Sequence, residues 1–235
     1  MKAESNRAAS KKPVPPLSEE AIQGNKQQRL QKFKLTGFDD HGTTAWNLEG
    51  DAAAIDSQKT IILEQNVTLR MRDQTVVRTD HVKWSQDGGE LTTNAVVTVD
   101  HQEGHVVGRG ARGMPNEGFI QLHHEIVMTL KGNSKVTCAG PLKIYYNENR
   151  MVFYRKVVVL DERGSLTANR MDVFFDPADH KVREIVAEGN VVIEQGGDKT
   201  RSRRAIYSMK TGSVRLEGNP EITLTKAKSG VYGLT

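Results

Sequence analysis

Several features that would define a common class of protein are missing from this sequence. Cys138 is the only cysteine, which excludes an intrachain disulfide and a four-cysteine zinc site. The longest uninterrupted apolar runs are four residues, such as 157–160, far short of the roughly 20 that a membrane-spanning helix needs. No signal peptide or anchor is recognisable, so two alternatives stay open: a protein soluble in the cytosol, or one whose removed signal or anchor preceded Met1.

Catalytic groupings are also scarce. No Gly-x-x-x-x-Gly-Lys-Ser/Thr pattern occurs, and no motif supplies a nucleophile together with its base. His101 and His105 flank an apparent turn that could clip a metal, and His123 and His124 point to opposite faces of an expected strand. Roles at turns and on the surface explain these histidines more simply. We therefore expect no enzyme, no metal site and no cofactor.

Charge is concentrated at the N-terminus. Residues 1–34 hold eight Lys and Arg against three Glu, a net charge of +5, which leaves −1 for the rest because the whole chain carries +4. This basic arm has no aromatic side chain before Phe33 on which a base could stack, which argues against nucleic-acid binding. A basic arm on a near-neutral body suits an anionic membrane surface.

The chain divides into a short linker and a long body rich in strands. Residues 1–28 contain Lys-Lys-Pro-Val-Pro-Pro at 11–16, lack hydrophobic periodicity, and are predicted to form an unstructured, flexible, Pro-rich basic linker. From Phe33 onward, short alternating blocks rich in Val, Thr and Ile are separated by Gly, Asn and Asp, as in antiparallel β-structure. The predicted strands are 31–38, 44–50, 60–71, 75–84, 91–100, 104–109, 119–130, 134–139, 142–147, 151–160, 165–175, 182–195, 201–208, 213–217 and 221–226.

An internal echo indicates a repeated unit. Gly-Glu-Leu-Thr-Thr-Asn at 89–94 returns as Gly-Ser-Leu-Thr-Ala-Asn at 164–169, and each copy opens a strand after a glycine turn. Repeated strand pairs of this kind usually stack so that neighbouring units share one continuous core. The echo is equally compatible with a structural β-solenoid.

Four short motifs carry a family resemblance. Ala-Gly-Pro-Leu at 139–142, Gly-Ser-Leu-Thr-Ala-Asn-Arg-Met at 164–171, Ala-Glu-Gly-Asn-Val-Val-Ile at 187–193 and Leu-Glu-Gly-Asn-Pro at 216–220 follow one another in order. This stretch resembles the OstA-like domain of lipopolysaccharide export proteins. Residues 33–110 resemble the C-type, inner-membrane-anchored component, through Phe-Lys-Leu-Thr-Gly at 33–37 and the run from Gly42 to Ala52.

The resemblance implies an all-β fold, an antiparallel, twisted and open β-jellyroll in which two sheets face each other. We expect an LptC-like β region at 29–115 and an OstA/LptA-like β region at 116–235, continuous with each other. An unclosed sheet leaves unpaired backbone groups at its ends, and the resemblance implies head-to-tail association of copies edge to edge.

The function implied by the resemblance is transport rather than catalysis. The chain would be a periplasmic bridge that binds the lipid A acyl chains of lipopolysaccharide and carries it from an inner-membrane ABC transporter toward the outer membrane. Its partners would be components of that transporter and other OstA-like bridge proteins, and an N-terminal segment absent from this chain would anchor it to the inner membrane. The rival hypotheses are a polymer-forming envelope scaffold without a lipid ligand and a polysaccharide-active β-protein, which the low aromatic content of 6% disfavours.

Strand alternation predicts which side chains point between the facing sheets. A lipid chain of about a dozen methylenes costs roughly 10 kcal/mol to expose to water, so a carrier needs a continuous apolar track. The predicted groove residues, which would otherwise form an ordinary sandwich core, are Phe33, Leu35, Trp46, Leu48, Ile61, Leu63, Val67, Leu69, Met171, Val173, Phe175, Val191, Ile193, Tyr207 and Leu216. Candidates for meeting lipid phosphates at the groove mouth are Arg70, Arg72, Arg170, Arg201, Arg203 and Arg204.

Overall fold

The structure is a computed structural model that describes residues 28–39, 41–55, 60–102, 104–131 and 134–225. Almost all of the linker predicted at 1–28 lies outside the described residues. The elements are β1 (Gln28–Phe38), β2 (Thr44–Ile55), β3 (Thr60–Met71), β4 (Val76–Ser85), β5 (Glu90–His101), β6 (Gly104–Met114), η2 (Pro115–Glu117), β7 (Phe119–Leu130), β8 (Lys135–Cys138), β9 (Leu142–Tyr145), η3 (Tyr146–Glu148), β10 (Arg150–Asp161), β11 (Gly164–Phe175), β12 (Val182–Gln195), β13 (Asp198–Ser208), β14 (Ser213–Glu217) and β15 (Glu221–Thr223).

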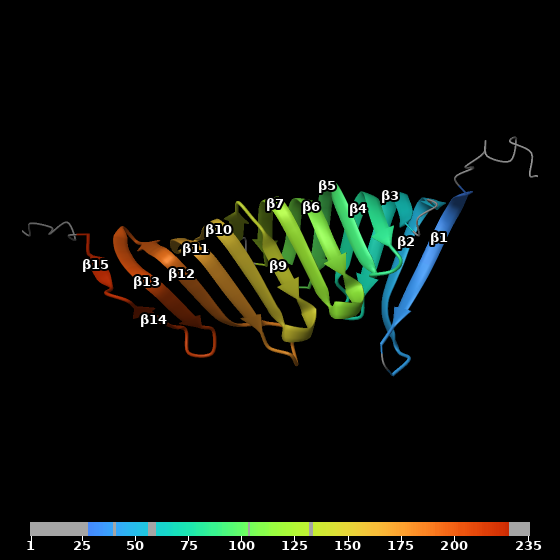
Figure 1. Ribbon diagram of the computed structural model, residues 1–235. Coiled ribbons are helices and arrows are strands. Elements are labelled where there is room, and N and C mark those ends of the chain that lie inside the picture. Colours follow the sequence, from blue (N-terminus) through green and yellow to red (C-terminus); the bar gives the residue numbers. More distant parts are fainter. Residues whose placement is uncertain (1–27, 40, 56–59, 103, 132–133, 226–235) are drawn as a thin grey trace, which may run out of the picture.

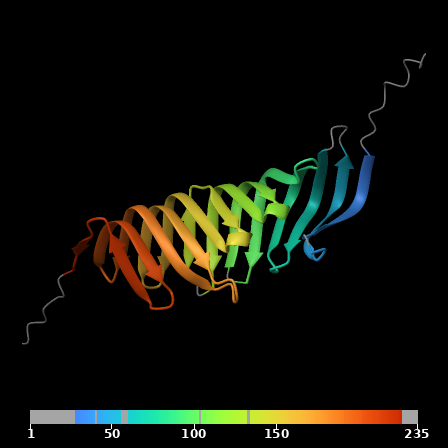
Figure 2. The same ribbon diagram turned by 60° about the horizontal axis from the view of Figure 1, so that its bottom comes forward.

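All the strands belong to one antiparallel sheet of 15 strands, which confirms the predicted all-β class. Nearly every strand pairs with its neighbours in sequence, so the sheet grows along one axis from β1 to β14 and β15 (Figures 1 and 2). The two edges of the sheet therefore lie at opposite ends of an elongated body.

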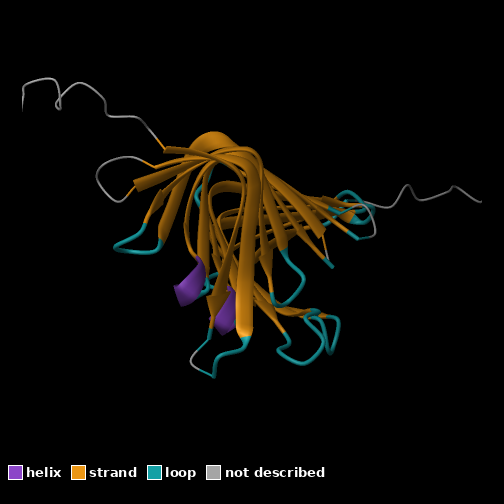
Figure 3. Cartoon of the chain, turned by 90° about the vertical axis from the view of Figure 1, so that its right-hand side faces the viewer, coloured by secondary structure: helices purple, strands orange, loops and turns teal. Residues whose placement is uncertain are grey.

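Most of the long strands bend near their middle. The pairing register shifts there, for example between Glu64 and Val67 of β3 and between Tyr154 and Val157 of β10. Backbone φ angles at these bends are positive, such as 65° at Gln65 and 61° at Arg155. Such bulges bend a strand sharply. Viewed along the long axis, the strands arch over and form two walls, so the two facing sheets of the predicted jellyroll are the walls of one folded sheet (Figure 3).

The bends explain why two of the predicted strands were shorter than the observed ones. The strands expected at 44–50 and 104–109 run on to Ile55 and Met114. The glycines at their apparent ends lie instead at the bend: a Cβ on Gly50 would lie 2.6 Å from the Phe33 ring, and Gly110 has a φ of +69°. A glycine within a strand pattern marks a bend or close approach as often as an end.

At two places in the sheet, two short strands occupy the place of one long strand. β8 and β9 pair with opposite halves of β7 and of β10, and the residues between them include Gly140 and Pro141. β14 and β15 divide β13 between them in the same way. Gly-Pro at 140–141 and Gly-Asn-Pro at 218–220 therefore interrupt a strand where neighbouring strands bulge.

The core consists of three clusters along the axis. One joins β2 to β4, with Phe33 and Leu35 of β1 packed against it; a larger one spans β5 to β11; and a small one lies between β11, β12 and β13. The central cluster is the largest and contains fully buried side chains, including Leu122 and Leu142 at 0% exposure and Phe153 at 1%.

Candidate functional site

The space between the two walls opens along two rims. We call rim 1 the turns that follow β1, β3, β5, β7, β10 and β12, and rim 2 the turns that follow β4, β6, β9, β11 and β13; the antiparallel register places each set along one edge of the folded sheet. The interior lies between them and receives alternate side chains of every strand.

The interior is filled at its centre. We call the central cluster the packed middle; Leu122 of β7, Leu142 of β9 and Phe153 of β10 meet there and exclude solvent. The two small cavities that border it hold only about 40 and 50 Å³. Protein interiors pack at the density of organic crystals, and this section of the groove is an interior of that kind.

The interior is hollow toward the C-terminal end. A cavity of about 320 Å³ lies between β10, β11, β12, β13 and β14, and we call it the C-terminal hollow. Its apolar lining includes Met171, Ile193 and the two alanines Ala187 and Ala205, which lie opposite each other on β12 and β13. Small side chains at inward positions leave this space open, and its size falls within the roughly 300–1,000 Å³ of ligand sites.

A second hollow lies toward the N-terminal end. Its volume is about 310 Å³. It is bordered by the apolar side chains of Trp46, Leu48, Trp84 and Leu91 and by the turns of rim 2 at 86–89 and 115–116, which include Gln86, Asp87 and Asn116. The indole Nε1 of Trp46 donates a hydrogen bond of 2.9 Å to Oδ1 of Asn116, which joins β2 to rim 2. We call this space the N-terminal hollow.

The fifteen predicted groove residues all lie on the inner side of the walls. Eight belong to the N-terminal cluster, three to the packed middle and three to the C-terminal cluster, and Tyr207 lines the C-terminal hollow. Leu63, Leu48 and Val67 are at most 2% exposed, so these residues serve first as core. Met171, Ile193 and Tyr207 border the C-terminal hollow, and Trp46 and Leu48 border the N-terminal hollow.

The centre of the interior was missing from the predicted set. The inward residues of β7, β9 and β10, such as Leu122, Leu142 and Phe153, form its densest part. Alternation in Phe-Ile-Gln-Leu at 119–122 and in Met-Val-Phe-Tyr at 151–154 carries the same signal as the strands that were chosen. The alanines that open the hollow could not be found in this way, because a small residue at an inward position is also common in filled cores.

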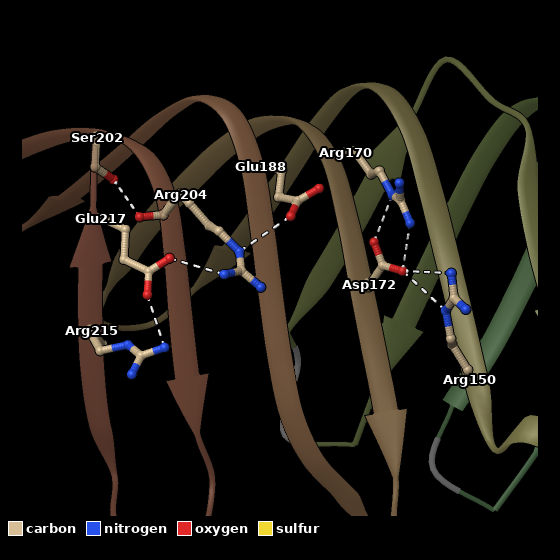
Figure 4. Close-up of polar contacts among 8 residues, drawn as sticks. All are labelled: Arg150, Arg170, Asp172, Glu188, Ser202, Arg204, Arg215 and Glu217. Carbon is tan, nitrogen blue, oxygen red and sulfur yellow. Dashed lines mark hydrogen bonds and ion pairs between the residues drawn. The ribbon is translucent and has the colours of Figure 1, made fainter. Parts of the chain in front are cut away.

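Three of the predicted phosphate-binding arginines lie on the outer face instead of the mouth. Arg170 binds Asp172 through two hydrogen bonds of 2.7 and 2.9 Å, and Arg150 binds the same carboxylate at 3.0 Å (Figure 4). Asp172 is only 4% exposed, and its hydrogen bonds raise the pKa of Arg170. That prediction was wrong for Arg70, Arg170 and Arg204, because each points away from the interior and pairs with a nearby acid.

The charged contacts continue across the outer face. Arg204 pairs with Glu188 at 3.2 Å and with Glu217 at 2.9 Å, and Arg215 pairs with the second oxygen of Glu217 at 2.8 Å (Figure 4). Opposite charges on adjacent strands stabilise a sheet, and like charges in these positions would repel. These ladder contacts form two groups, one that joins β10 to β11 and one that joins β12, β13 and β14, on the side that faces away from the hollow.

One arginine does border the C-terminal hollow. Arg163, in the turn of rim 1 after β10, binds Asp161 at 2.9 Å, and hydrogen bonding to Asp161 and to Tyr207 raises its pKa. Tyr207 comes from the end of β13 beside rim 2, so this contact crosses the mouth of the hollow. The hollow thus combines an apolar floor with polar groups at its opening.

The residues considered for catalysis are dispersed. His105 contacts Asp100 at 2.6 Å, and this hydrogen bond lowers the pKa of Asp100; His101 instead lies against His180, with ring centroids 6.1 Å apart. Burial raises the pKa of the Cys138 thiol. Across the described ranges, no group of three or more His, Cys, Asp or Glu side chains is placed to hold a metal ion.

Comparison with protein families matches both halves of the sheet. Residues 19–130 match the family described as lipopolysaccharide-assembly, LptC-related, and residues 138–233 match the LptA/LptD N-terminal domain family of LPS transport proteins. The chain belongs to the OstA-like LptC/LptA family of lipopolysaccharide transport proteins. The first match ends with β7 at Leu130, and the second begins at Cys138, the last residue of β8.

The family places this chain in lipopolysaccharide transport across the periplasm. These are families of transport proteins, which agrees with an interior that offers an apolar cavity. A search of curated proteins found no match. In the part of the chain that the structure describes, no helix is long and apolar enough to cross a membrane.

Proposed function

We propose that this protein is a periplasmic bridge that holds lipopolysaccharide by its lipid A acyl chains and carries it from the inner-membrane ABC transporter toward the outer membrane. The observation that carries the proposal is the C-terminal hollow, whose floor is apolar and whose mouth bears Arg163. Removing acyl methylenes from water contributes about 0.8 kcal/mol each, and an open apolar cavity of this size supplies the surface.

The ends of the sheet support the proposed contacts with other bridge proteins and transporter components. Most of the large exposed apolar side chains lie at the two ends: Leu30 and Phe38 in β1, and Met209, Val214, Ile222 and Leu224 at the other edge. Edge strands expose unpaired backbone groups that a partner strand can satisfy. We propose that these edges bind other OstA-like proteins or further copies of this chain, head to tail.

The proposal also includes the arrangement along the chain. An LptC-like region at 29–115 and an OstA/LptA-like region at 116–235 would form one continuous carrier, and an N-terminal segment beyond this chain would hold it at the inner membrane. The continuous pairing of β6, β7 and β8 supports a single rigid bridge.

Photocrosslinking tests lipid binding directly. Crosslinkers at Leu48, Phe175 and Ile193 should label with purified lipid A, and the strongest labelling should occur at Ile193, which borders the C-terminal hollow. Asn47 is the control, because its side chain accepts a hydrogen bond of 2.9 Å from Thr36 outside the groove. Equal labelling at all four positions would contradict a groove site.

Filling the hollow is a second, independent test. Ala187→Leu with Ala205→Leu places bulk where the structure has open space, and lipid A binding should be lost while the fold is retained. The matched control is Ala52→Leu, which makes the same change on the outward side of β2 opposite Glu64. Undiminished binding by the filled variant would remove the hollow from consideration.

The scaffold without a lipid ligand is the second candidate, and the packed middle favours it. A filled interior is typical of a structural sheet, and the centre of this one leaves cavities of only about 40 and 50 Å³. The two hypotheses differ in the lipid A labelling at Ile193, which the scaffold does not predict.

A further inference from the structure

The two rims touch at the middle of the molecule. Thr75, in the turn of rim 1 after β3, lies against Tyr146, the first residue of η3 on rim 2. Thr75 is 1% exposed and the hydroxyl of Tyr146 is buried, which raises the pKa of Tyr146. Beside this pair, His101 of rim 1 and His180 of rim 2 meet edge to face with ring centroids 6.1 Å apart. We call these four residues the latch.

The latch is closed by an incomplete interaction. Neither the Thr75 Oγ1 nor the Tyr146 hydroxyl forms a well-aligned hydrogen bond with any described residue, although the two side chains lie in contact. A buried polar group without a good hydrogen-bond partner destabilises the state in which it is buried. Separation of the rims would let water reach both hydroxyls, so the closed state pays a penalty that an open state avoids.

The latch lies over the section of the interior that separates the two hollows. It covers the packed middle, and Met151 and Phe175 lie in the small space beneath it. The N-terminal hollow lies on one side of this section and the C-terminal hollow on the other. Thr75 and His101 belong to the LptC-related match, whereas Tyr146 and His180 belong to the match with the LptA/LptD N-terminal domain.

Two routes between the hollows are closed in this structure. The route through the interior is filled by Leu122, Leu142 and Phe153, and the route along the mouth is closed by the latch. An acyl chain that moves from one hollow to the other must therefore displace packed side chains, and it can do so only if the walls separate at this point.

We propose that the latch is a gate between the two hollows, which opens to let acyl chains pass from the LptC-related part to the LptA-related part of the sheet. This inference rests on the proposed lipid-carrying function and adds a barrier at one defined place. The imperfect Thr75 and Tyr146 pair makes that barrier weak enough to open, and the packed middle closes it again when no lipid is present.

A reversible cross-link across the rims tests the gate. His101→Cys and His180→Cys, in a chain that also carries Cys138→Ala, place two thiols where the rings now touch. A short bifunctional thiosulfonate reagent locks the rims together, and a reductant releases them. Each single cysteine variant treated with the same reagent is the control, and thermal melting verifies the fold.

The readout is photolabelling by purified lipid A at two positions. A diazirine analogue of methionine replaces Met151 beneath the latch or Ile193 in the C-terminal hollow. We expect Ile193 to label whether the rims are locked or free, and Met151 to label only when they are free. Thr75→Val with Tyr146→Phe should also reduce labelling at Met151, because it replaces an imperfect polar pair with apolar groups of similar shape and tightens the latch.

The possible outcomes separate the gate from the carrier. Equal labelling of Met151 in the locked and the released protein would overturn the gate, and so would labelling of Ile193 with no labelling of Met151 in either state. Absence of labelling at Ile193 in the released protein would instead refute the proposed lipid-carrying function itself.

Discussion

The packed middle and the C-terminal hollow are neighbouring sections of one antiparallel sheet and share two strands, yet one is filled and the other is open. β10 and β11 contribute to both: Phe153 and Val157 close the centre, whereas Val159 and Leu166 border the hollow. The strands across the hollow present Ala187 and Ala205 at inward positions, where β7 and β9 present leucine. The length of the inward side chain thus decides whether a folded sheet becomes a core or a cavity.

Because of this difference, two sections of one continuous sheet have different roles. A filled section supplies rigidity, because each fully buried large side chain contributes stability that a hollow lining cannot. An open section supplies binding surface at the expense of packing. The following changes test whether the two regions differ as this comparison requires.

The largest effect is expected from truncation in the packed middle. Phe153→Ala removes a side chain that is 1% exposed and should lower the free energy of unfolding by about 3–5 kcal/mol. Ile193→Ala, at the border of the hollow, should cost roughly 1–2 kcal/mol, because fewer packed atoms lose contacts. Urea unfolding of both variants measures the difference, and equal losses would show that the hollow is closed in solution.

The outer face offers the next comparison. Asp172→Asn removes a carboxylate that is 4% exposed and binds two arginines, and we expect a loss of about 2–3 kcal/mol. Glu217→Gln, at the more exposed end of the ladder, should change the free energy of unfolding by at most about 1 kcal/mol. Thermal melts at low and high salt check the order, since only the exposed pair should respond clearly to salt.

Replacing an inward alanine with leucine should also affect the stability of the two regions differently. Ala111→Leu beside Leu122 adds more volume than the neighbouring cavity of about 50 Å³ can take without rearrangement, and it should destabilise the fold by about 1–2 kcal/mol. Ala187→Leu should cost less than Ala111→Leu, because Ala187, although 1% exposed, lines a cavity of about 320 Å³ into which the added methyl groups can extend. Chemical denaturation of the two variants provides the measurement, and a penalty as large at Ala187 would argue that this wall cannot accept larger side chains.

The smallest effect concerns pH. Hydrogen bonding to His105 lowers the pKa of Asp100 at rim 1, so its contribution to stability is present above the ordinary range of an aspartate and is lost as the pH falls through the lowered pKa. Asp100→Asn should therefore reduce stability by less than about 1 kcal/mol at neutral pH, and the difference should vanish under acid conditions. Unfolding followed between about pH 7 and pH 2 checks this. A difference that persists at the acid end would assign the effect to shape and not to charge.

The sequence predicted much of this arrangement. Alternation and turn residues located all fifteen strands, and the inward parity of Leu63, Val67 and Met171 agrees with the structure. It missed the continuation of two strands beyond Gly50 and Gly110, because a glycine at a bend and a glycine at an end look alike in sequence. It also assigned Arg170 to the groove mouth, since its acidic partner Asp172 became visible only once the side chains were placed.

What the sequence determined by itself is local: where strands begin and which face of each strand is apolar. These follow from a period of two residues and from turn chemistry, both of which act within a few positions. Only the tertiary structure decided which inward residues meet across the groove. The contact of Thr75 with Tyr146 and the cavity beside Ala187 depend on how far one folded sheet twists between its two rims, and that geometry is the sum of every bend along its length.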